Sequence, residues 1–374
     1  MTHAPLTVDP QDSAPGIVLS APTPAFARRV PGRIGVLPDA ASRPSPLAAL
    51  LDWLSRKLPG ATLLMLKRVL AAMLLACLLL YLGNLPFLSA ARVERFDAVA
   101  HRGVHHTYSR EDLTNETCTA TRINPPTHEY IENTLPSMRA AFAAGATRIE
   151  IDVHRTTDGE LAIFHDWTLD CRTEHRGETR KQSLALLQSL DVGYGYTADG
   201  GATFPLRGKG IGAMPSLRQV LTEFPDGHFV IDQKDRDAQT TALVSEQLRA
   251  FDAVDRVCLH AIPDRRRQYL AANPAGCTFA GRQEIKSCLI DYLKVGWFGA
   301  VPSVCRQQRL VVPAGGLSRL LWGWPGTFVE RMRAHGSRVY VYTDDASESE
   351  RWRAYGFDGL WTDRIEMRAS NASR

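Results

Sequence analysis

The sequence predicts an α/β fold, a TIM-type (β/α)8 barrel preceded by a single N-terminal transmembrane helix. Three observations lead to this fold class. Short β-branched or apolar runs alternate with helical patterns from Phe96 onward, polar residues follow the ends of several runs, and one long apolar segment precedes them all. The 374 residues provide enough chain for one barrel of roughly 250 residues and an appendage.

Nine runs qualify as strands, one more than an eight-stranded barrel uses. The second and third are separated by Asp158-Gly159, a turn that usually reverses the chain into an antiparallel hairpin. If the third run folds back over the barrel mouth, eight parallel strands remain and the last closes the ring. The nine runs are Ala98–Ala100, Arg148–Asp152, Leu161–His165, His228–Asp232, Arg256–His260, Cys277–Ala280, Arg309–Val312, Arg338–Thr343 and Gly359–Thr362.

The apolar segment over residues 69–88 is long enough to cross a bilayer as a helix. Eight arginines and lysines precede it and only Arg92 and Arg95 follow closely, which favours a cytoplasmic N-terminus and an extracytoplasmic domain, periplasmic in a bacterium. We expect a disordered cytoplasmic tail over 1–60, a transmembrane anchor over 61–91 and a barrel domain over 95–370. The alternatives are a cleaved signal sequence ending near Ala90-Ala91 and a buried core helix.

Charge and cysteine content limit the partners and the compartment. The formal charge of +4 is small for this length and is not gathered into one basic stripe, so nucleic acid is not an expected partner. Six of the seven cysteines follow the apolar segment. An oxidising compartment would allow up to three disulfides among them, in a pairing that the sequence leaves open, and buried free thiols are the alternative.

Carboxylates lie at the predicted carboxyl ends of two strands, where barrels of this class carry their working groups. Glu150 and Asp152 are two residues apart on one strand, so their side chains share a face, and Asp232 could supply a third carboxylate. Three carboxylates around one pocket would repel one another without a cation. Their oxygen ligands favour Ca²⁺ or Mg²⁺.

His101 and His165 also follow predicted strands, and imidazole is suited to general acid and base work because it titrates near neutral pH. Arg102 and Lys234 would hold a phosphate, and Asp166 either orients a histidine or caps the following helix. Five other histidines lack an equally placed carboxylate and are interpreted as loop or surface residues: His105, His106, His128, His154 and His175.

Together these residues resemble the glycerophosphodiester phosphodiesterase family, which has a PLC-like phosphodiesterase architecture. The resemblance begins with His101-Arg102-Gly103 and Glu132-Asn133-Thr134 and covers residues 97–365. It continues through Glu150-x-Asp152, Thr157-Asp158-Gly159, His165-Asp166, Leu169, Arg172-Thr173, Leu190-Asp191-x-Gly193, Pro215-Ser216-Leu217, Asp358-Gly359 and Thr362-Asp363.

The resemblance implies hydrolysis of glycerophosphodiesters to glycerol 3-phosphate and an alcohol. By position, His101 and His165 match the acid and base of the family, and Glu150 and Asp152 match its ligands for Ca²⁺ or Mg²⁺. Asp232 stands where a third acidic ligand, usually glutamate, is found. A glycerol hydroxyl of the substrate is the expected nucleophile, giving a cyclic phosphate that water then opens. Glu132 and Asn133 would contact metal or substrate, or Asn133 would cap the following helix.

Two insertions depart from the family pattern and bear on specificity. Val104–Ile131 contains Cys118, which a disulfide to Cys171 would tie beside the active site, and Gly195–Gly212 lengthens a second loop. The membrane anchor makes lysophospholipase D-type activity on a membrane-derived lysophospholipid an alternative to a small soluble substrate. Remoter alternatives are a sphingomyelinase D-type enzyme and a catalytically silent envelope binding protein.

Overall fold

The computed structural model describes residues 45–57, 59–85, 93–114 and 117–368, and the chain divides into two compact units, residues 1–68 and 69–374. Most of the expected cytoplasmic tail and the alternative cleavage site at Ala90-Ala91 lie outside the described residues. Helix α1 spans Pro46–Lys57, and helix α2, Gly60–Leu82, runs from the first unit into the second.

Helix α2 is long and apolar enough to cross a membrane. Its 23 residues would extend about 35 Å, which exceeds the roughly 30 Å hydrocarbon core of a bilayer. None of its residues is buried, so the interpretation as a core helix of the barrel is wrong. A membrane span or a signal sequence remains consistent with this helix.

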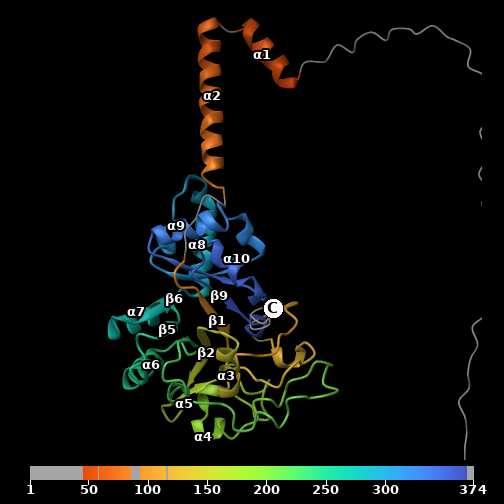
Figure 1. Ribbon diagram of the computed structural model, residues 1–374, viewed down its shortest axis with the longest axis vertical. Helices are drawn as coiled ribbons and strands as arrows, with labels where there is room; N and C mark the ends of the chain where they lie inside the picture. The colour runs from red at the N-terminus through yellow and green to blue at the C-terminus, as the bar shows by residue number, and fades with distance from the viewer. Residues whose placement is uncertain (1–44, 58, 86–92, 115–116, 369–374) are drawn as a thin grey trace, which may run out of the picture. The chain divides into compact units, whose positions relative to one another are not determined.

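A nearly closed barrel of eight parallel strands forms the second unit, as expected (Figure 1). The strands lie in the order β6-β5-β4-β2-β1-β9-β8-β7. Between the ends of this path, the amide of Ala280 donates to the carbonyl of Arg309 at 2.9 Å. The strands are β1 Asp97–His101, β2 Arg148–Arg155, β4 Phe229–Gln233, β5 Val257–His260, β6 Cys277–Phe279, β7 Arg309–Pro313, β8 Arg338–Tyr342 and β9 Gly359–Thr362.

The remaining strand, β3 Leu161–Ile163, pairs antiparallel with β2 and stays outside the ring. The amides of Thr156 and Gly159 close the turn between the two strands, and Gly159 adopts a positive φ of 77°, which glycine tolerates at little cost. The predicted hairpin is therefore confirmed. It carries His165 to the carboxyl ends of the barrel strands.

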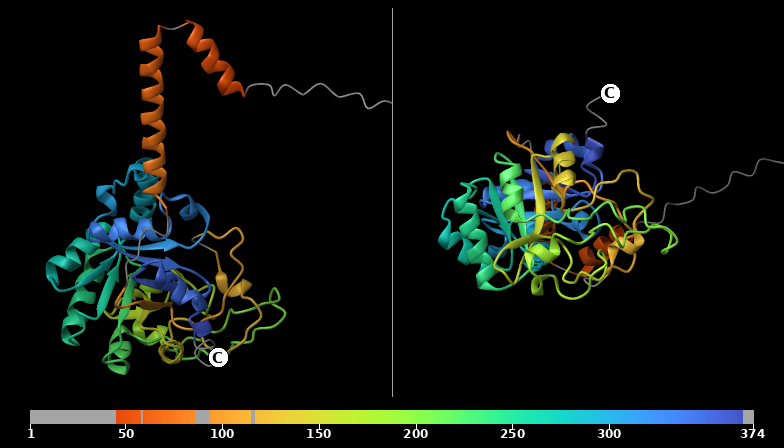
Figure 2. Two further views of the ribbon diagram at one scale, coloured as in Figure 1. Left: turned by 45° about the horizontal axis from the view of Figure 1, so that its top comes forward. Right: turned by 90° about the horizontal axis from the view of Figure 1, so that it is seen from below.

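Helices cover the outer surface of the strands (Figures 1 and 2). Their apolar faces pack on outward-pointing strand residues such as Ile149, Ile151 and Phe229. The helices of this unit are α3 Leu135–Ala143, α4 Leu184–Leu187, α5 Leu217–Glu223, α6 Ala238–Ala250, α7 Pro263–Ala272, α8 Arg282–Val295, α9 Gly326–Ala334 and α10 Ser349–Ala354, with 3₁₀ turns η1 Thr119–Arg122, η2 Thr179–Lys181, η3 Gly296–Phe298, η4 Ser303–Cys305, η5 Gly316–Leu320 and η6 Ala346–Glu348.

The barrel interior is filled by a layer of large side chains from six strands. Side chains alternate between the two faces of a strand, so the residue two positions after each of these side chains also points into the barrel, nearer the carboxyl end of the strand. Val99 is thus followed by His101, Val230 by Asp232, and Trp361 by Asp363. The apolar layer closes the floor beneath the polar one. Its members are Val99, Val230, Cys258, Phe279, Tyr340 and Trp361.

Three disulfides join the six cysteines that follow α2: Cys118–Cys171, Cys258–Cys277 and Cys288–Cys305. Cys258 and Cys277 are register partners on the neighbouring strands β5 and β6. Disulfides of this number are typical of proteins in an oxidising compartment.

Candidate active site

Strand register brings the predicted carboxylates together. His101 is paired with Glu150 between β1 and β2, and Asp152 with Asp232 between β2 and β4. One ligand oxygen from each of Glu150, Asp152 and Asp232 lies within 4.8 Å of the others. The sequence therefore predicted correctly that the three acidic side chains meet.

The carboxylate cluster has the character of a cation site. Burial and the neighbouring charges of Asp152 and Asp232 raise the pKa of Glu150 well above its usual range. The donor atoms are all carboxylate oxygens, which suit a hard divalent cation. The Lys234 ammonium lies 2.6 Å from both Asp152 Oδ1 and Asp232 Oδ2, so it offsets part of the negative charge. Glu150, Asp152 and Asp232 thus fit a divalent cation chemically.

His101 lies at the inner edge of this cluster and is held by a carboxylate from the last strand. Its Nδ1 is 2.5 Å from Asp363 Oδ1, and its Nε2 is 3.8 Å from Glu150 Oε2. The Tyr342 hydroxyl donates to Asp363 Oδ2 at 2.8 Å, and Arg110 also binds that oxygen. Burial opposes ionisation of Asp363, but His101 lowers the pKa of Asp363 well below its usual range. Asp363 is therefore an ionised partner that fixes the His101 ring.

His165 has a separate carboxylate partner on the hairpin side. Its Nδ1 lies 2.7 Å from Asp166 Oδ1, and Asp166 Oδ2 accepts from Arg172 Nε at 2.8 Å. Of the two readings of Asp166, the structure thus shows the orienting one. Burial, Arg102 and Lys234 lower the pKa of His165 to about 4.

Arg102 and Asn133 reach the cluster because both adopt a left-handed backbone, with φ of 58° and 60°. Such residues are strained and are often found at functional sites. The Arg102 guanidinium pairs with Glu132 at 3.1 Å and with Asp152 at 3.3 Å. Asn133 Nδ2 donates to Asp152 at 2.8 Å, whereas the hydroxyl of Thr134 caps α3. The alternative that Asn133 caps this helix is therefore wrong.

Gly103 explains the close approach of α3 to this turn. A Cβ at Gly103 would lie 2.2 Å from the Ser137 hydroxyl, and its φ is +82°. Only glycine fits without displacing the helix. The Ser137 hydroxyl is then free to donate to the carbonyls of Arg102 and Val104, at 3.2 and 2.8 Å.

Arg172, whose role the sequence reasoning missed, joins the two sides of the site. It is fully buried and binds Asp166 at 2.8 Å and Glu132 at 3.0 Å. Burial opposes ionisation of Glu132, but Arg172 and Arg102 lower the pKa of Glu132 to about 2. The preceding residue, Cys171, is disulfide-bonded to Cys118, so this disulfide fixes the segment that carries Arg172.

Two of the histidines interpreted as loop or surface residues have buried carboxylate partners, and that interpretation is wrong for them. His105 Nε2 lies 3.5 Å from Asp363, and His154 Nδ1 lies 3.4 Å from Asp235. His106 is also buried, with 5% of its surface exposed. A further missed neighbour, His260, lies 3.1 Å from Asp232 Oδ1. Its place at the end of β5, in register with Asp232, is the signal that could have found it.

Residues 101–367 match the model of the glycerophosphoryl diester phosphodiesterase family. A glycerophosphodiester phosphodiesterase of Caldanaerobacter subterraneus subsp. tengcongensis is 39% identical over 239 residues, covering 63% of this chain and 89% of the relative.

Two solved structures share the fold. The glycerophosphoryl diester phosphodiesterase domain of a Mycobacterium tuberculosis protein has a TM-score of 0.56 at 16% identity and covers 75% of this chain and 100% of that domain. A phosphodiesterase of Oleispira antarctica, solved with the product sn-glycerol-3-phosphate, has a TM-score of 0.50 at 20% identity and covers 74% of this chain and 97% of that one. The chain belongs to the glycerophosphoryl diester phosphodiesterase family.

Proposed function

We propose that this phosphodiesterase hydrolyses glycerophosphodiesters to glycerol 3-phosphate and an alcohol in a divalent-metal-dependent reaction, with His101 and His165 as general acid and base. The observation that supports this most strongly is the pair of histidines, each bonded to its own carboxylate, near the cluster of Glu150, Asp152 and Asp232. In this arrangement one imidazole can accept the proton of the attacking hydroxyl, and the other can donate a proton to the leaving alkoxide.

In the proposed reaction, one histidine removes the proton from a glycerol hydroxyl of the substrate, whose oxygen attacks phosphorus. The other histidine protonates the departing alkoxide, so the bond to the alcohol breaks as the cyclic phosphate forms. Water then opens the ring with the proton transfers reversed. Lys234 and Arg102 supply the positive charge that holds the phosphate, Lys234 from within the cluster and Arg102 from its buried side.

Glu150, Asp152 and Asp232 would hold the cation, Ca²⁺ or Mg²⁺. When bound, such a cation polarises a phosphoryl oxygen. Asp232 reaches less far than a glutamate would, and it is already contacted by Lys234 and His260. Asn133 and Arg102 fix the orientation of Asp152 through its Oδ2 atom. Glu132 keeps Arg102 in place from the opposite side.

His101→Ala and His165→Ala test the proposed roles. Each should lower kcat/KM on glycerophosphocholine by about 10²- to 10⁴-fold, the usual contribution of one acid–base group. EDTA should abolish activity, and added Ca²⁺ or Mg²⁺ should restore it. His175→Ala, at a partly exposed histidine of a loop, is the matched control. Wild-type rates in both site variants would refute the assignment.

A membrane-derived lysophospholipid is the second candidate substrate, because an apolar helix precedes the barrel. A pocket of about 500 Å³ is lined by the end of the insertion over 104–131, by Thr134 and Pro136 at the start of α3, and by Lys209 and Ala213. Its wall includes Tyr130, Ile131 and Pro136, so it offers apolar as well as polar contacts. Comparing turnover of glycerophosphocholine and lysophosphatidylcholine distinguishes the two substrates, and turnover of neither would reject both.

We also propose the organisation expected from the sequence: a cytoplasmic tail over 1–60, an anchor over 61–91 and an extracytoplasmic catalytic domain over 95–370. The disulfides support an oxidising location for the domain. The positive charge that precedes the apolar run over 69–88 supports a cytoplasmic N-terminus. Protease added to intact spheroplasts should digest the barrel; protection of the barrel would reverse the proposed topology.

A further inference from the structure

Large apolar side chains gather on the outside of the barrel where α8 ends and α9 begins. We call this surface, formed by the exposed apolar residues of 297–298 and 317–322, the apolar flank. Trp297 and Phe298 lie on η3, Leu317 and Leu320 on η5, and Trp322 follows η5. Their exposed fractions are 43%, 53%, 72%, 65% and 41%. Exposed apolar residues in such density are characteristic of a surface that meets another apolar phase.

Hydrogen bonds join the two segments of the flank into one surface. The Trp322 indole nitrogen donates to the Leu293 carbonyl at 2.9 Å, and the Tyr292 hydroxyl donates to the Trp322 carbonyl at 2.9 Å. The rings of Trp297 and Phe298 lie 4.8 Å apart. Both segments are thus fixed to the last turn of α8, so their exposure is not that of a loose loop.

The chain leaving α2 is bonded to the same place. Arg331 donates to the carbonyl of Gly83, the residue after the helix, at 2.9 Å and to the carbonyl of Gly296 at 2.8 Å. Asn84 Nδ2 donates to the carbonyl of Trp297 at 2.8 Å. If α2 spans the membrane, the chain leaves the hydrocarbon core near the end of this helix. The flank would then lie close to the polar interfacial layer of the membrane.

We propose that the apolar flank docks on the lipid bilayer. Tryptophan is favoured at the membrane interface, because its ring is apolar and its indole nitrogen is a hydrogen-bond donor. Leu317 and Leu320, with Arg319 between them, form a turn that can insert apolar side chains while keeping a cation among the headgroups. The proposal rests on the membrane anchor inferred above.

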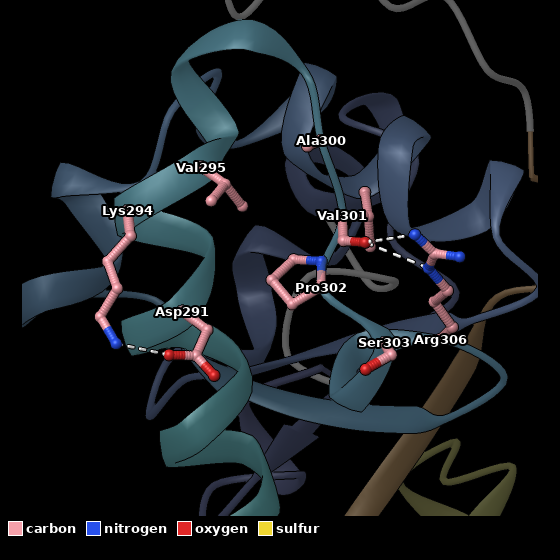
Figure 3. A pocket seen from close by; sticks show the side chains of 8 residues that line it. All are labelled: Asp291, Lys294, Val295, Ala300, Val301, Pro302, Ser303 and Arg306. Atoms are coloured by element: carbon pink, nitrogen blue, oxygen red, sulfur yellow. Dashed lines mark hydrogen bonds and ion pairs between the residues drawn. The ribbon is translucent and has the colours of Figure 1, made fainter.

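A hollow beside the flank supports this orientation (Figure 3). It has a volume of about 410 Å³ and is lined by residues on both sides of η3, among them Lys294, Val295, Val301 and Arg306. Figure 3 shows Lys294 directed toward Asp291, and Arg306 toward the carbonyl of Val301. The apolar flank is therefore bordered by polar and cationic side chains, as a surface at headgroup level requires.

Docking would restrict how the domain turns about its anchor. The flank is fixed to the last turn of α8, the helix that leaves the carboxyl end of β6 and returns the chain to β7, so it lies toward the amino ends of the strands. The mouth that contains the two histidines, at the carboxyl ends, would stay uncovered by this contact.

Quenching of tryptophan fluorescence by brominated phospholipids tests the docking. The full chain carrying Trp53→Phe, which removes the tryptophan of α1, is placed in nanodiscs of phosphatidylcholine and phosphatidylglycerol. Brominated lipid should quench its fluorescence, and Trp297→Phe with Trp322→Phe should remove most of that quenching. Trp167→Phe, at a residue 46% exposed on the hairpin side, is the control and should leave the quenching intact.

A second pair of variants keeps the tryptophans. Leu317→Glu with Leu320→Glu adds charge to the flank and should reduce the quenching of Trp297 and Trp322. Ile211→Glu, at a residue 67% exposed on the second insertion, should not. Turnover of glycerophosphocholine reports folding of the flank variants and should be unchanged in them.

Alkaline carbonate extraction separates the two possible failures. Release of the chain from native membranes would refute the anchor and the docking surface with it. Retention of the chain with quenching unaffected by all four flank substitutions would refute only the docking surface. Cross-linking between two copies through position 317, without lipid quenching, would show that a second copy of the chain covers the flank and would also overturn the proposal.

Discussion

The two histidines have similar partners but are fixed by different parts of the molecule. His101 and Asp363 come from β1 and the end of β9, neighbouring strands of the barrel. We call them the wall pair. His165 and Asp166, the hairpin pair, are adjacent in sequence and lie beyond β3, outside the ring of strands. The wall pair is assembled when the barrel closes. The hairpin pair depends on the contacts that hold its loop.

Those contacts are buried charges and a covalent link. Arg172 binds the hairpin carboxylate, and the Cys118–Cys171 disulfide fixes the adjoining segment to the insertion. Arg172 also contacts Thr119 and Tyr196, from the insertion and from the second inserted loop. A histidine outside the barrel wall thus gains its position from segments that the barrel fold itself does not require. Perturbing the insertions should therefore affect the hairpin pair first.

Removing the charge of either partner carboxylate should have the largest effect. Asp363→Asn and Asp166→Asn should each lower kcat/KM by about 10²-fold or more, because each carboxylate orients a histidine and stabilises its protonated form. Burial and Arg102 lower the pKa of His101, and Asp363 opposes this lowering, so the loss of Asp363 should move the corresponding limb of the pH–rate profile to lower pH. A large loss of kcat/KM in only one variant would show that the two carboxylates do not contribute equally to catalysis. An unchanged pH profile in Asp363→Asn would show that Asp363 does not affect the protonation of His101.

Arg172→Met should destabilise the domain by about 3–5 kcal/mol, because it leaves the buried carboxylates of Asp166 and Glu132 without their shared cation. Denaturant unfolding measures this loss. Arg110→Met is the matched control on the wall side: Arg110 contacts Asp363, but 43% of its side chain is exposed. Its loss should cost no more than about 1 kcal/mol. Equal destabilisation by both variants would remove the distinction drawn between the two pairs.

The wall of the barrel could be predicted from sequence far more completely than the support of the hairpin. Each strand leaves a local signal, an apolar run that ends in polar residues, so all nine strands and the meeting of Glu150, Asp152 and Asp232 were predicted. The extra strand was also assigned correctly, because Asp158-Gly159 marks a hairpin.

What escaped prediction depends on contacts between distant segments. Asp363 stands at a strand end and could have been assigned from its position there. Arg172 gives no such signal, because its partners Asp166 and Glu132 lie on separate loops and its burial follows from the packing of two insertions. His105 and His154 were placed wrongly for the same reason: their carboxylates, Asp363 and Asp235, are far away in sequence.

Breaking the Cys118–Cys171 disulfide should have a smaller effect on stability than Arg172→Met. It should still disturb the positions of His165 and Asp166, the hairpin pair. The cysteines are 53 residues apart, and closing such a loop contributes about 2–4 kcal/mol. Replacing both cysteines by serine should lower the melting temperature and kcat. Replacing Cys288 and Cys305 should lower the melting temperature but leave kcat unchanged at temperatures where the domain is folded. Unchanged kcat in the variant without Cys118 and Cys171 would show that this disulfide does not position the hairpin.

The smallest expected effect is a loss of folding stability at acid pH, caused by His106 in the insertion next to the hairpin. The His106 ring stacks on His128 at 4.3 Å and lies 6.3 Å from Tyr196, which in turn binds Arg172. Burial and the two neighbouring histidines lower the pKa of His106 from 6.5 to about 4. Between these values the unfolded chain binds a proton that the folded chain does not, so stability falls as pH drops below about 6.5 and is unaffected above it.

His106→Gln removes this proton uptake. From pH 7 to pH 5 the variant should lose about 2 kcal/mol less unfolding free energy than the unmodified chain, as measured by denaturant unfolding at both pH values. Hydrogen exchange should locate the difference in the insertion and the hairpin, and leave β1 and β9 unchanged. An identical loss of stability in both proteins would exclude His106 as the acid-sensitive group. Faster exchange in β1 and β9 at pH 5 would show instead that acid opens the barrel wall as readily as the hairpin.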